Sequence, residues 1–354
     1  MKIWFEALTG KQALLFHYMA AHFEKLGHQT VFTTRSYDYV ESNLRRLGRT
    51  KFYSIGTYGG ASLKDKLISG TQRILKLAEI MDREKPDLLI TLASPDATRT
   101  AFGLAIPVIQ INDTPHAKAV ARLTLAISEA LVHPEAIDSS AFRGYGASKI
   151  YTYKGVDEVL WIKDFVPDVS VLDKIGIEPY SYIVVRCEES KAAYFREMYP
   201  EIPAGSTIVV DIIRKIKERG MNHKIVAFPR YEEQQELLQD FPNVIIPDES
   251  VDTLSVLYYA SAAMTGGGTM GREGAMLGTP TLYTFPRELE VSTYVIQRGF
   301  PLIHFPDHLG AVDKLIELAR TPRLDEKKRK EMLANFETPL DGIIRAMANL
   351  ELNL

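Results

Sequence analysis

Three successive glycines, Gly266, Gly267 and Gly268, follow a short apolar segment and precede a segment with helical periodicity. Glycine lets the main chain approach a ligand closely, and the unpaired N–H groups at a helix N-terminus favour an anion. We therefore expect the glycines and Thr269 to bind a diphosphate. Glu273 lies one helical turn further on, where its carboxylate can accept hydrogen bonds from a ribose diol. The alternative interpretation is a tight turn in which the glycines only avoid steric strain.

Basic residues stand at the ends of other expected strands. Arg186 ends the first strand of the second half of the chain, and Arg230 follows the next strand. A guanidinium at either position could bind the diphosphate through two parallel hydrogen bonds, or pair with a nearby glutamate at the surface. Gly10 and Lys11 open the first helix at the carboxyl edge of the first strand, where doubly wound sheets bind ligands. Lys11 is therefore a candidate to contact a phosphate or a sugar, the alternative being a solvated charge.

Two aspartates and a histidine follow strands expected in the first half of the chain. Asp96 follows one strand, and Asp113 and His116 follow the next, so each is a candidate general base toward a hydroxyl. The same residue types suit a helix start. Asp113 or Thr114 would then cap the helix expected over residues 117–127. Both interpretations are open for Asp96 and Asp113.

The sequence argues against several other kinds of site. Cys187 is the single cysteine, which excludes an internal disulfide and a multi-cysteine zinc site and favours a reducing cytoplasm. His, Asp and Glu do not recur at metal-ligand spacing, so we expect neither a metal nor a bound cofactor. The residues around Lys11 do not complete a Walker A loop, and the sequence has no Gly-x-Ser-x-Gly elbow, so P-loop and serine-hydrolase chemistry are not expected.

Composition narrows the range of partners. The chain has 42 basic and 45 acidic residues, a net charge of −3, and so lacks the surplus needed to bind nucleic acid or an anionic bilayer by charge alone. Apolar residues at 46% and charged residues at 25% are typical of a folded soluble protein. No run approaches the roughly 18 consecutive apolar residues that would span a bilayer. We therefore expect a soluble cytoplasmic protein that holds any anionic ligand locally.

The order of the elements predicts the fold class. A length of 354 residues favours two domains, and apolar segments alternate with helical periodicity as in α/β proteins with parallel sheets. Strands are expected over residues 2–5, 29–33, 51–55, 87–92, 107–111, 130–132, 182–186, 224–228, 243–246, 262–265, 281–284 and 302–304. Helices are expected over residues 11–26, 63–83, 117–127, 207–219, 232–239, 251–260, 269–277, 311–320 and 340–350. Residues 164–171 lack a clear period and contain a proline, so they are the expected linker between Rossmann-like domains at residues 1–163 and 172–354.

The glycine loop and its surroundings resemble a known motif. The three glycines, Glu273, Gly278 and Pro280 resemble the donor-nucleotide motif of GT-B glycosyltransferases and of non-hydrolysing UDP-N-acetylglucosamine 2-epimerases. In the first half, several segments look like the matching epimerase segments in the same order, namely residues 86–90, the Asp96 loop, residues 106–108 and residues 122–135. As a whole, the chain most resembles an archaeal family known as domain of unknown function 354, whose members look like GT-B proteins.

The resemblance implies a GT-B-like fold, in which two Rossmann-like domains face each other across a cleft. It further implies a metal-independent glycosyltransferase. Residues 172–354 would bind a UDP-like nucleotide-sugar donor, and residues 1–163 would bind an acceptor. The identity of the acceptor is open, and lipid-linked molecules and small glycans are candidates. Relatives use the glycine loop for the diphosphate and a glutamate at the place of Glu273 for the ribose. The alternatives are a sugar-nucleotide epimerase and a non-catalytic sugar-nucleotide-binding protein, and the oligomeric state is open.

The chain departs from the epimerases at two places. They carry His-Arg-Arg-Glu-Asn after the first strand of the second domain, whereas this chain reads Arg-Cys-Glu-Glu-Ser over residues 186–190. Their His-Val-Glu segment in the first domain is replaced by Gln-Ile-Asn over residues 110–112. Because the histidine is missing, the sequence weighs against a strict epimerase.

Overall fold

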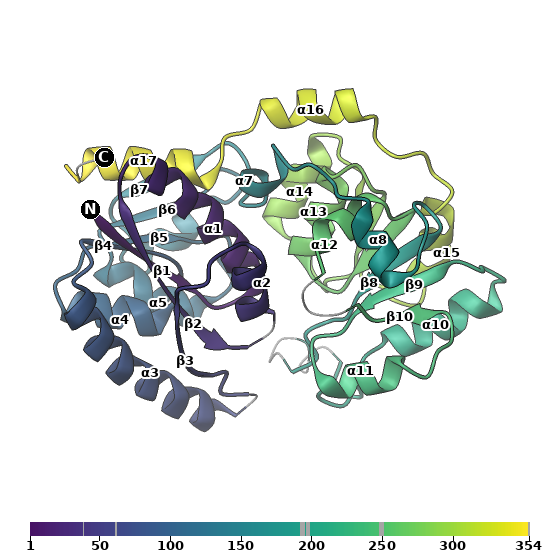
Figure 1. Cartoon of the computed structure of the whole chain (residues 1–354), viewed down its shortest axis with the longest axis horizontal. Helices are drawn as coiled ribbons and strands as arrows, with labels where there is room; N and C mark the ends of the chain where they lie inside the picture. Colours follow the sequence, from purple (N-terminus) through teal and green to yellow (C-terminus); the bar gives the residue numbers. More distant parts are fainter. Residues whose placement is uncertain (38, 61, 192–194, 196–198, 248–250, 353–354) are drawn as a thin grey trace. The chain divides into compact units, whose positions relative to one another are not determined.

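The computed structural model describes residues 1–352 apart from 38, 61, 192–194, 196–198 and 248–250. The chain divides into two compact units. Unit 1 comprises Met1–Trp161 together with Phe336–Leu354, and unit 2 comprises Ile162–Asn335. Each unit contains a parallel sheet flanked by helices, as Figure 1 shows. The expected fold class, two parallel-sheet α/β domains, is confirmed.

In unit 1 the sheet has seven strands in the order β3-β2-β1-β4-β5-β6-β7. The elements are β1 (Lys2–Ala7), α1 (Gly10–Lys25), β2 (Gln29–Ser36), α2 (Val40–Arg46), β3 (Tyr53–Thr57), α3 (Leu63–Glu84), β4 (Leu88–Leu92), α4 (Pro95–Gly103), β5 (Val108–Ile111), α5 (Lys118–Thr124), a 3-10 turn (Leu125–Ile127), β6 (Ala130–Pro134), α6 (Ser140–Arg143), β7 (Ile150–Tyr153), α7 (Val159–Ile162, which crosses the boundary between the units) and α17 (Pro339–Asn349).

The central strand β1 shows how helices cover both faces of this sheet. Trp4 packs in a cluster with residues of α3 and α4, such as Leu77 and Ala97. The next residue, Phe5, lies 5.4 Å from the ring of Phe16 in α1. Because consecutive strand residues point to opposite faces, α3 and α4 cover one face of the sheet and α1 covers the other (Figure 1).

In unit 2 the sheet has six strands in the order β10-β9-β8-β11-β12-β13. The elements are α8 (Ser170–Ile175), β8 (Tyr182–Arg186), α10 (Val209–Glu218), β9 (Lys224–Phe228), α11 (Glu232–Leu238), β10 (Val244–Ile245), α12 (Thr253–Tyr258), β11 (Ala262–Thr265), α13 (Gly268–Met276), β12 (Thr281–Tyr283), α14 (Glu290–Gln297), β13 (Leu302–His304), α15 (Ala311–Leu318) and α16 (Glu326–Ala334). Ile183 and Val185 of β8 pack with Ile212 of α10 and Leu315 of α15, which forms the core on one face of the sheet.

The C-terminal segment corrects the expected domain boundaries. Residues 172–354 were expected to form one domain, but Phe336–Leu354 belongs to unit 1. Helix α17 buries Ile343, Ala346 and Met347 and packs against β6 and β7. The main chain adds to this docking, because the Glu337 N–H donates to the Lys154 carbonyl at 2.9 Å. An apolar helix face does not itself reveal which of two sheets it will cover.

Candidate functional site

Three neighbouring strands of unit 2 end at the same level. In the sheet register, Arg186 of β8 lies beside Phe228 of β9 on one side and Thr265 of β11 on the other. The residues that follow each strand therefore share one edge of the sheet. That edge carries Arg230, Glu188 and the glycine loop, and ligands of doubly wound sheets bind at such carboxyl edges.

The three glycines of the loop have different surroundings. A Cβ atom on Gly266 would lie 2.6 Å from the Cα atom of Glu188, and one on Gly268 would lie 2.6 Å from Nη1 of Arg272. The contact with the main chain of Glu188 is too close for any side chain, so packing requires Gly266. A side chain at Gly268 would instead have to displace the side chains of Arg272 and Leu289. A Cβ atom on Gly267 would instead lie 3.6 Å from Nη2 of Arg230, an ordinary contact. Steric crowding by the main chain therefore explains Gly266, and Gly267 is the position that faces Arg230.

The loop leads directly into the N-terminus of α13. Gly267 is the N-cap, with φ −140° and ψ 169°, and has no side chain to accept the amides of the first turn. Those amides, which include Gly268 and Thr269, lie at the positive end of the helix dipole. This is the arrangement that binds phosphate at other helix N-termini.

The two arginines differ in their main-chain contacts. Arg186 is buried, and its Nη1 donates to the carbonyls of Pro229 at 2.9 Å and Phe228 at 3.3 Å. Arg230 is more exposed. Its Nε donates to the Cys187 carbonyl at 3.1 Å, and its Nη1 lies 3.7 Å from Oε2 of Glu189. Arg186 therefore stabilises the end of β9 through its hydrogen bonds, whereas Arg230 lies beside the glycine loop.

Acidic side chains at this edge are buried. Glu273 in α13 is 5% exposed, and it follows Arg272, whose Nη1 donates to Ser292 Oγ at 3.2 Å. The carboxylate of Glu188 accepts hydrogen bonds from Thr207 Oγ1 at 3.0 Å and the Ile208 amide at 2.9 Å. Burial raises the pKa of Glu188, although these hydrogen bonds oppose the shift. No motif in the sequence marks Glu188 as a site residue, and its one signal is its place two residues after β8.

Unit 1 holds a buried cluster of charges around Lys11, in the first turn of α1 after Gly10. Its Nζ lies 2.5 Å from Asp113 Oδ2, 2.7 Å from Asp157 Oδ2 and 3.9 Å from Glu158 Oε1. The Lys11 side chain is 13% exposed, so the interpretation as a solvated charge is wrong. Burial raises the pKa of Asp157, and the Lys11 ammonium opposes that shift. Asp157 and Glu158 follow β7, a strand that the sequence analysis missed.

Asp96 belongs to a second charged cluster. Its Oδ2 accepts from Arg73 Nε at 2.9 Å, and the same guanidinium pairs with the buried carboxylate of Glu6. Burial raises the pKa of Glu6, which Arg73 opposes. Arg73 comes from α3 and Lys11 from α1, and these helices cover opposite faces of the sheet. Asp96 and Asp113 therefore have different charged partners.

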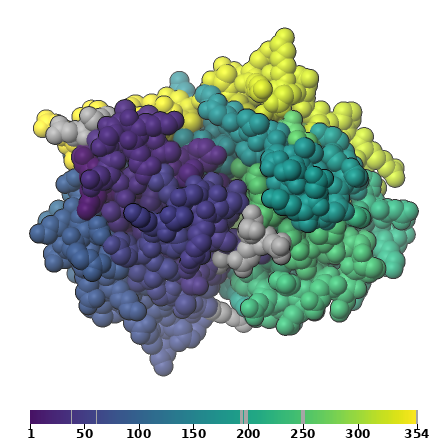
Figure 2. Space-filling model, viewed as in Figure 1, coloured from purple at the N-terminus to yellow at the C-terminus, as the bar shows by residue number. Residues whose placement is uncertain are grey.

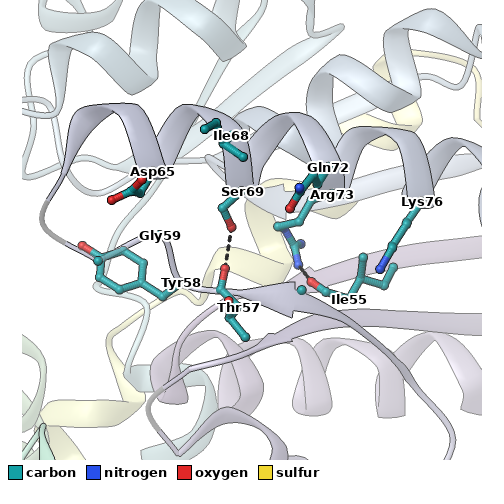
Figure 3. Close-up of a pocket in the computed structure, with 12 residues that line it drawn as sticks. Ile55, Thr57, Tyr58, Gly59, Asp65, Ile68, Ser69, Gln72, Arg73 and Lys76 are labelled. Atoms are coloured by element: carbon teal, nitrogen blue, oxygen red, sulfur yellow. Dashed lines mark hydrogen bonds between the residues drawn. The ribbon is translucent and has the colours of Figure 1, made fainter.

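A cavity of about 470 Å³ lies between β3 and α3, next to the Asp96 cluster (Figure 3). Arg73 and Lys76 line it from α3, and Tyr58 lines it from the loop after β3. Ser69 Oγ donates to the Thr57 carbonyl at 2.7 Å across its wall. No sequence pattern predicts this cavity, because its lining comes from a strand and a helix that are joined by an irregular loop.

The segment after β5 differs from the expected helix start. Helix α5 begins at Lys118 with Ala117 as its N-cap, so neither Asp113 nor Thr114 caps it. Asn112 instead accepts hydrogen bonds from the Thr114 amide at 2.8 Å and from its hydroxyl at 3.1 Å. This local turn competes with helix formation. His116 lies in the exposed turn that follows.

Within the described ranges of the chain, no three His, Cys, Asp or Glu residues are grouped so that they could hold a metal ion. No helix in the described part of the chain is long and apolar enough to cross a membrane.

The fold is that of GT-B proteins, as comparison with solved structures shows. The co-structure of S. aureus MnaA with UDP matches with a TM-score of 0.70 and 13% identity, over 99% of this chain and 97% of that chain. UDP-GlcNAc 2-epimerase from Methanocaldococcus jannaschii, in complex with UDP-GlcNAc and UDP, matches with a TM-score of 0.68 and 15% identity, over 99% and 100%. The spinosyn forosaminyltransferase SpnP matches with a TM-score of 0.60 and 14% identity, over 99% of both chains.

The chain belongs to the family described as protein of unknown function (DUF354), whose model matches residues 1–351. An uncharacterized protein of Methanocaldococcus jannaschii is 32% identical over 318 residues, which cover 87% of this chain and 88% of the relative. The family expected from the sequence is confirmed.

Proposed function

We propose that this protein is a metal-independent glycosyltransferase that uses a UDP-like nucleotide sugar as donor. The observation that carries the proposal is the shared edge of unit 2, where the glycine loop, the N-terminus of α13 and Arg230 come together. Main-chain amides and a guanidinium on one edge supply positive charge in a fixed geometry. Such a site stabilises the diphosphate that leaves during sugar transfer.

Each predicted donor residue has a role in this proposal. The amides after Gly267 and the guanidinium of Arg230 bind the diphosphate. Arg186 fixes the main chain at the end of β9 through its hydrogen bonds, and so positions Arg230 beside the glycine loop. Glu273 binds the ribose diol. The known proteins with this fold support a uridine nucleotide, because UDP or UDP-GlcNAc is named in two of the matching structures.

Unit 1 supplies the acceptor side in this proposal. Asp96, Asp113 and His116 are the candidate bases that take the proton of an acceptor hydroxyl. Gly10 begins α1, and Lys11 contacts the sugar or phosphate while it neutralises Asp113. Lipid-linked molecules and small glycans are the candidate acceptors to test.

A thermal-shift screen against UDP, GDP and CDP sugars tests the donor site. A ligand at about 100 times its Kd stabilises the folded protein by roughly 2.7 kcal/mol, which is readily measured. We expect stabilisation by UDP and its sugars. Stabilisation by none of the nucleotides would overturn the proposal. Transfer itself is tested by acceptor-dependent release of UDP from the donor that binds.

The second candidate function is epimerisation of a UDP-sugar. The buried cluster of Asp113, Asp157 and Glu158 around Lys11 favours it. Burial raises the pKa of Asp157, and a carboxyl group with a raised pKa can act in acid–base chemistry. NMR of UDP-GlcNAc incubated with the protein and no acceptor separates the two functions. An epimeric UDP-sugar supports epimerisation, acceptor-dependent UDP supports transfer, and binding without turnover indicates a non-catalytic sugar-nucleotide-binding protein.

A further inference from the structure

Helix α3 carries apolar side chains on its outer side. Leu63, Leu67 and Leu75 are 83%, 71% and 64% exposed. Their spacing of four and eight residues places them along one side of the helix. The core of unit 1 is covered by other residues of α3, such as Leu77 and Met81. Exposed leucines gathered in this way mark an interaction surface.

The surface of α3 can be followed in the space-filling view. Figure 2 shows blue atoms of this part of the chain on the surface of unit 1. Helix α4 packs beside α3 and exposes Phe102 to 56%. The cavity described above involves a different side of α3, since Ser69, Arg73 and Lys76 point toward β3 (Figure 3). The leucine face is thus separate from the cavity.

Charges of opposite sign stand at the two ends of this face. Lys64 lies in the first turn of α3 and Asp82 in the last, and both are exposed. They are separated by about five helical turns, so they lie on the same side of the helix, about 27 Å apart. Among the described residues neither has an ion-pair partner. Their positions are symmetric about Arg73, the midpoint between them.

We propose that the leucine face of α3 binds α3 of a second copy of this chain, with the two helices antiparallel. A two-fold axis that crosses the leucine face at the level of Arg73 places Lys64 opposite the partner's Asp82. By symmetry a second identical pair forms. Thr71 then lies opposite the partner's Leu75, and the small Thr71 and Ala78 side chains allow the helices to approach. This one arrangement of the two helices forms both the apolar contact and the two ion pairs.

The charges on the leucine face favour a second copy of the chain over a lipid surface as the binding partner. An anionic bilayer would attract Lys64 but repel Glu79 and Asp82 at the other end of the face. A parallel pairing of two α3 helices would place like charges together. The antiparallel arrangement instead pairs Lys64 with the partner's Asp82 at both ends of the face.

The test is the mass of the full chain in solution, measured by sedimentation equilibrium. We expect twice the 39.8 kDa of the chain. Leu67→Ser combined with Leu75→Ser should give the monomer, with an unchanged circular dichroism spectrum because both side chains are exposed. Leu237→Ser is the matched control, since Leu237 is an exposed leucine of α11 in unit 2. A monomeric wild type, or a dimer that survives the double leucine change, would overturn the proposal.

Charge reversal tests the antiparallel register. Lys64→Asp should weaken the dimer by about tenfold or more, because each pair becomes a repulsion. Adding Asp82→Lys to the same chain should restore the wild-type dissociation constant. A doubly reversed chain that stays as weak as the single variant would refute the antiparallel pairing.

Discussion

The Gly267→Ala variant distinguishes two interpretations of the glycine loop, a ligand-binding loop and a simple turn. The backbone there, at φ −140° and ψ 169°, is open to any residue, and the added methyl would meet only Arg230 at 3.6 Å. Loss of glycine freedom in the unfolded chain should leave stability equal or higher, by up to about 1 kcal/mol. The methyl would nevertheless stand where we place the diphosphate.

The expected loss of nucleotide affinity follows from the hydrogen bonds that the methyl disturbs. Hydrogen bonds to a charged group contribute about 1.5–3 kcal/mol, so Gly267→Ala should raise the Kd for UDP by about 10–150-fold. Isothermal calorimetry gives the Kd, and urea unfolding gives the stability. Gly266→Ala is the contrasting variant. Its methyl would lie 2.6 Å from the Cα atom of Glu188, so it should cost about 1–3 kcal/mol of stability. Wild-type affinity in Gly267→Ala would refute the binding role of the loop.

Three further predictions concern the same chain. Glu273→Ala should weaken UDP binding by about 1–3 kcal/mol through loss of the bonds to the ribose, and unchanged affinity in calorimetry would reject that role. EDTA should leave sugar transfer intact, because Arg230 and the N-terminus of α13 supply the positive charge; loss of transfer that magnesium or manganese restores would contradict this. Burial lowers the pKa of His308 from 6.5 to about 4, so the folded state resists protonation. The free energy of unfolding should therefore fall by about 3 kcal/mol as the pH drops from 6.5 to 4, and His308→Gln should reduce this dependence in urea titrations; an equal slope in both proteins would exclude His308 as its source.

The sequence was most informative where a local pattern determines the local structure. The bounds of β8, β9, β11 and β13 agree with those expected, because short apolar segments between polar residues define buried strands. Arg186, Arg230 and the glycine loop also lie near one another as expected, because the parallel strands that precede them end at one edge of the sheet.

What the sequence could not show depends on contacts between distant residues. Lys11 meets Asp157 across 146 positions of the chain, and Arg73 meets Glu6 across 67. A pattern within a short window contains no information about such partners. The same limit explains why Lys11 was open to interpretation as a solvated charge, and why α17 was expected in the domain of residues 172–354. Gly266 likewise is explained only by Glu188, which lies 78 positions earlier in the chain.

The return of α17 to unit 1 has a consequence for how the protein is made. The ribosome synthesises β7 of unit 1, then all of unit 2, and only then the segment that begins at Phe336. At 5–20 residues per second, this takes roughly 10–35 seconds. Throughout that time the nascent chain lacks the helix that covers β6 and β7, so an apolar strip of the sheet is exposed to chaperones and to other nascent chains. The last residues synthesised thus complete the first unit to emerge.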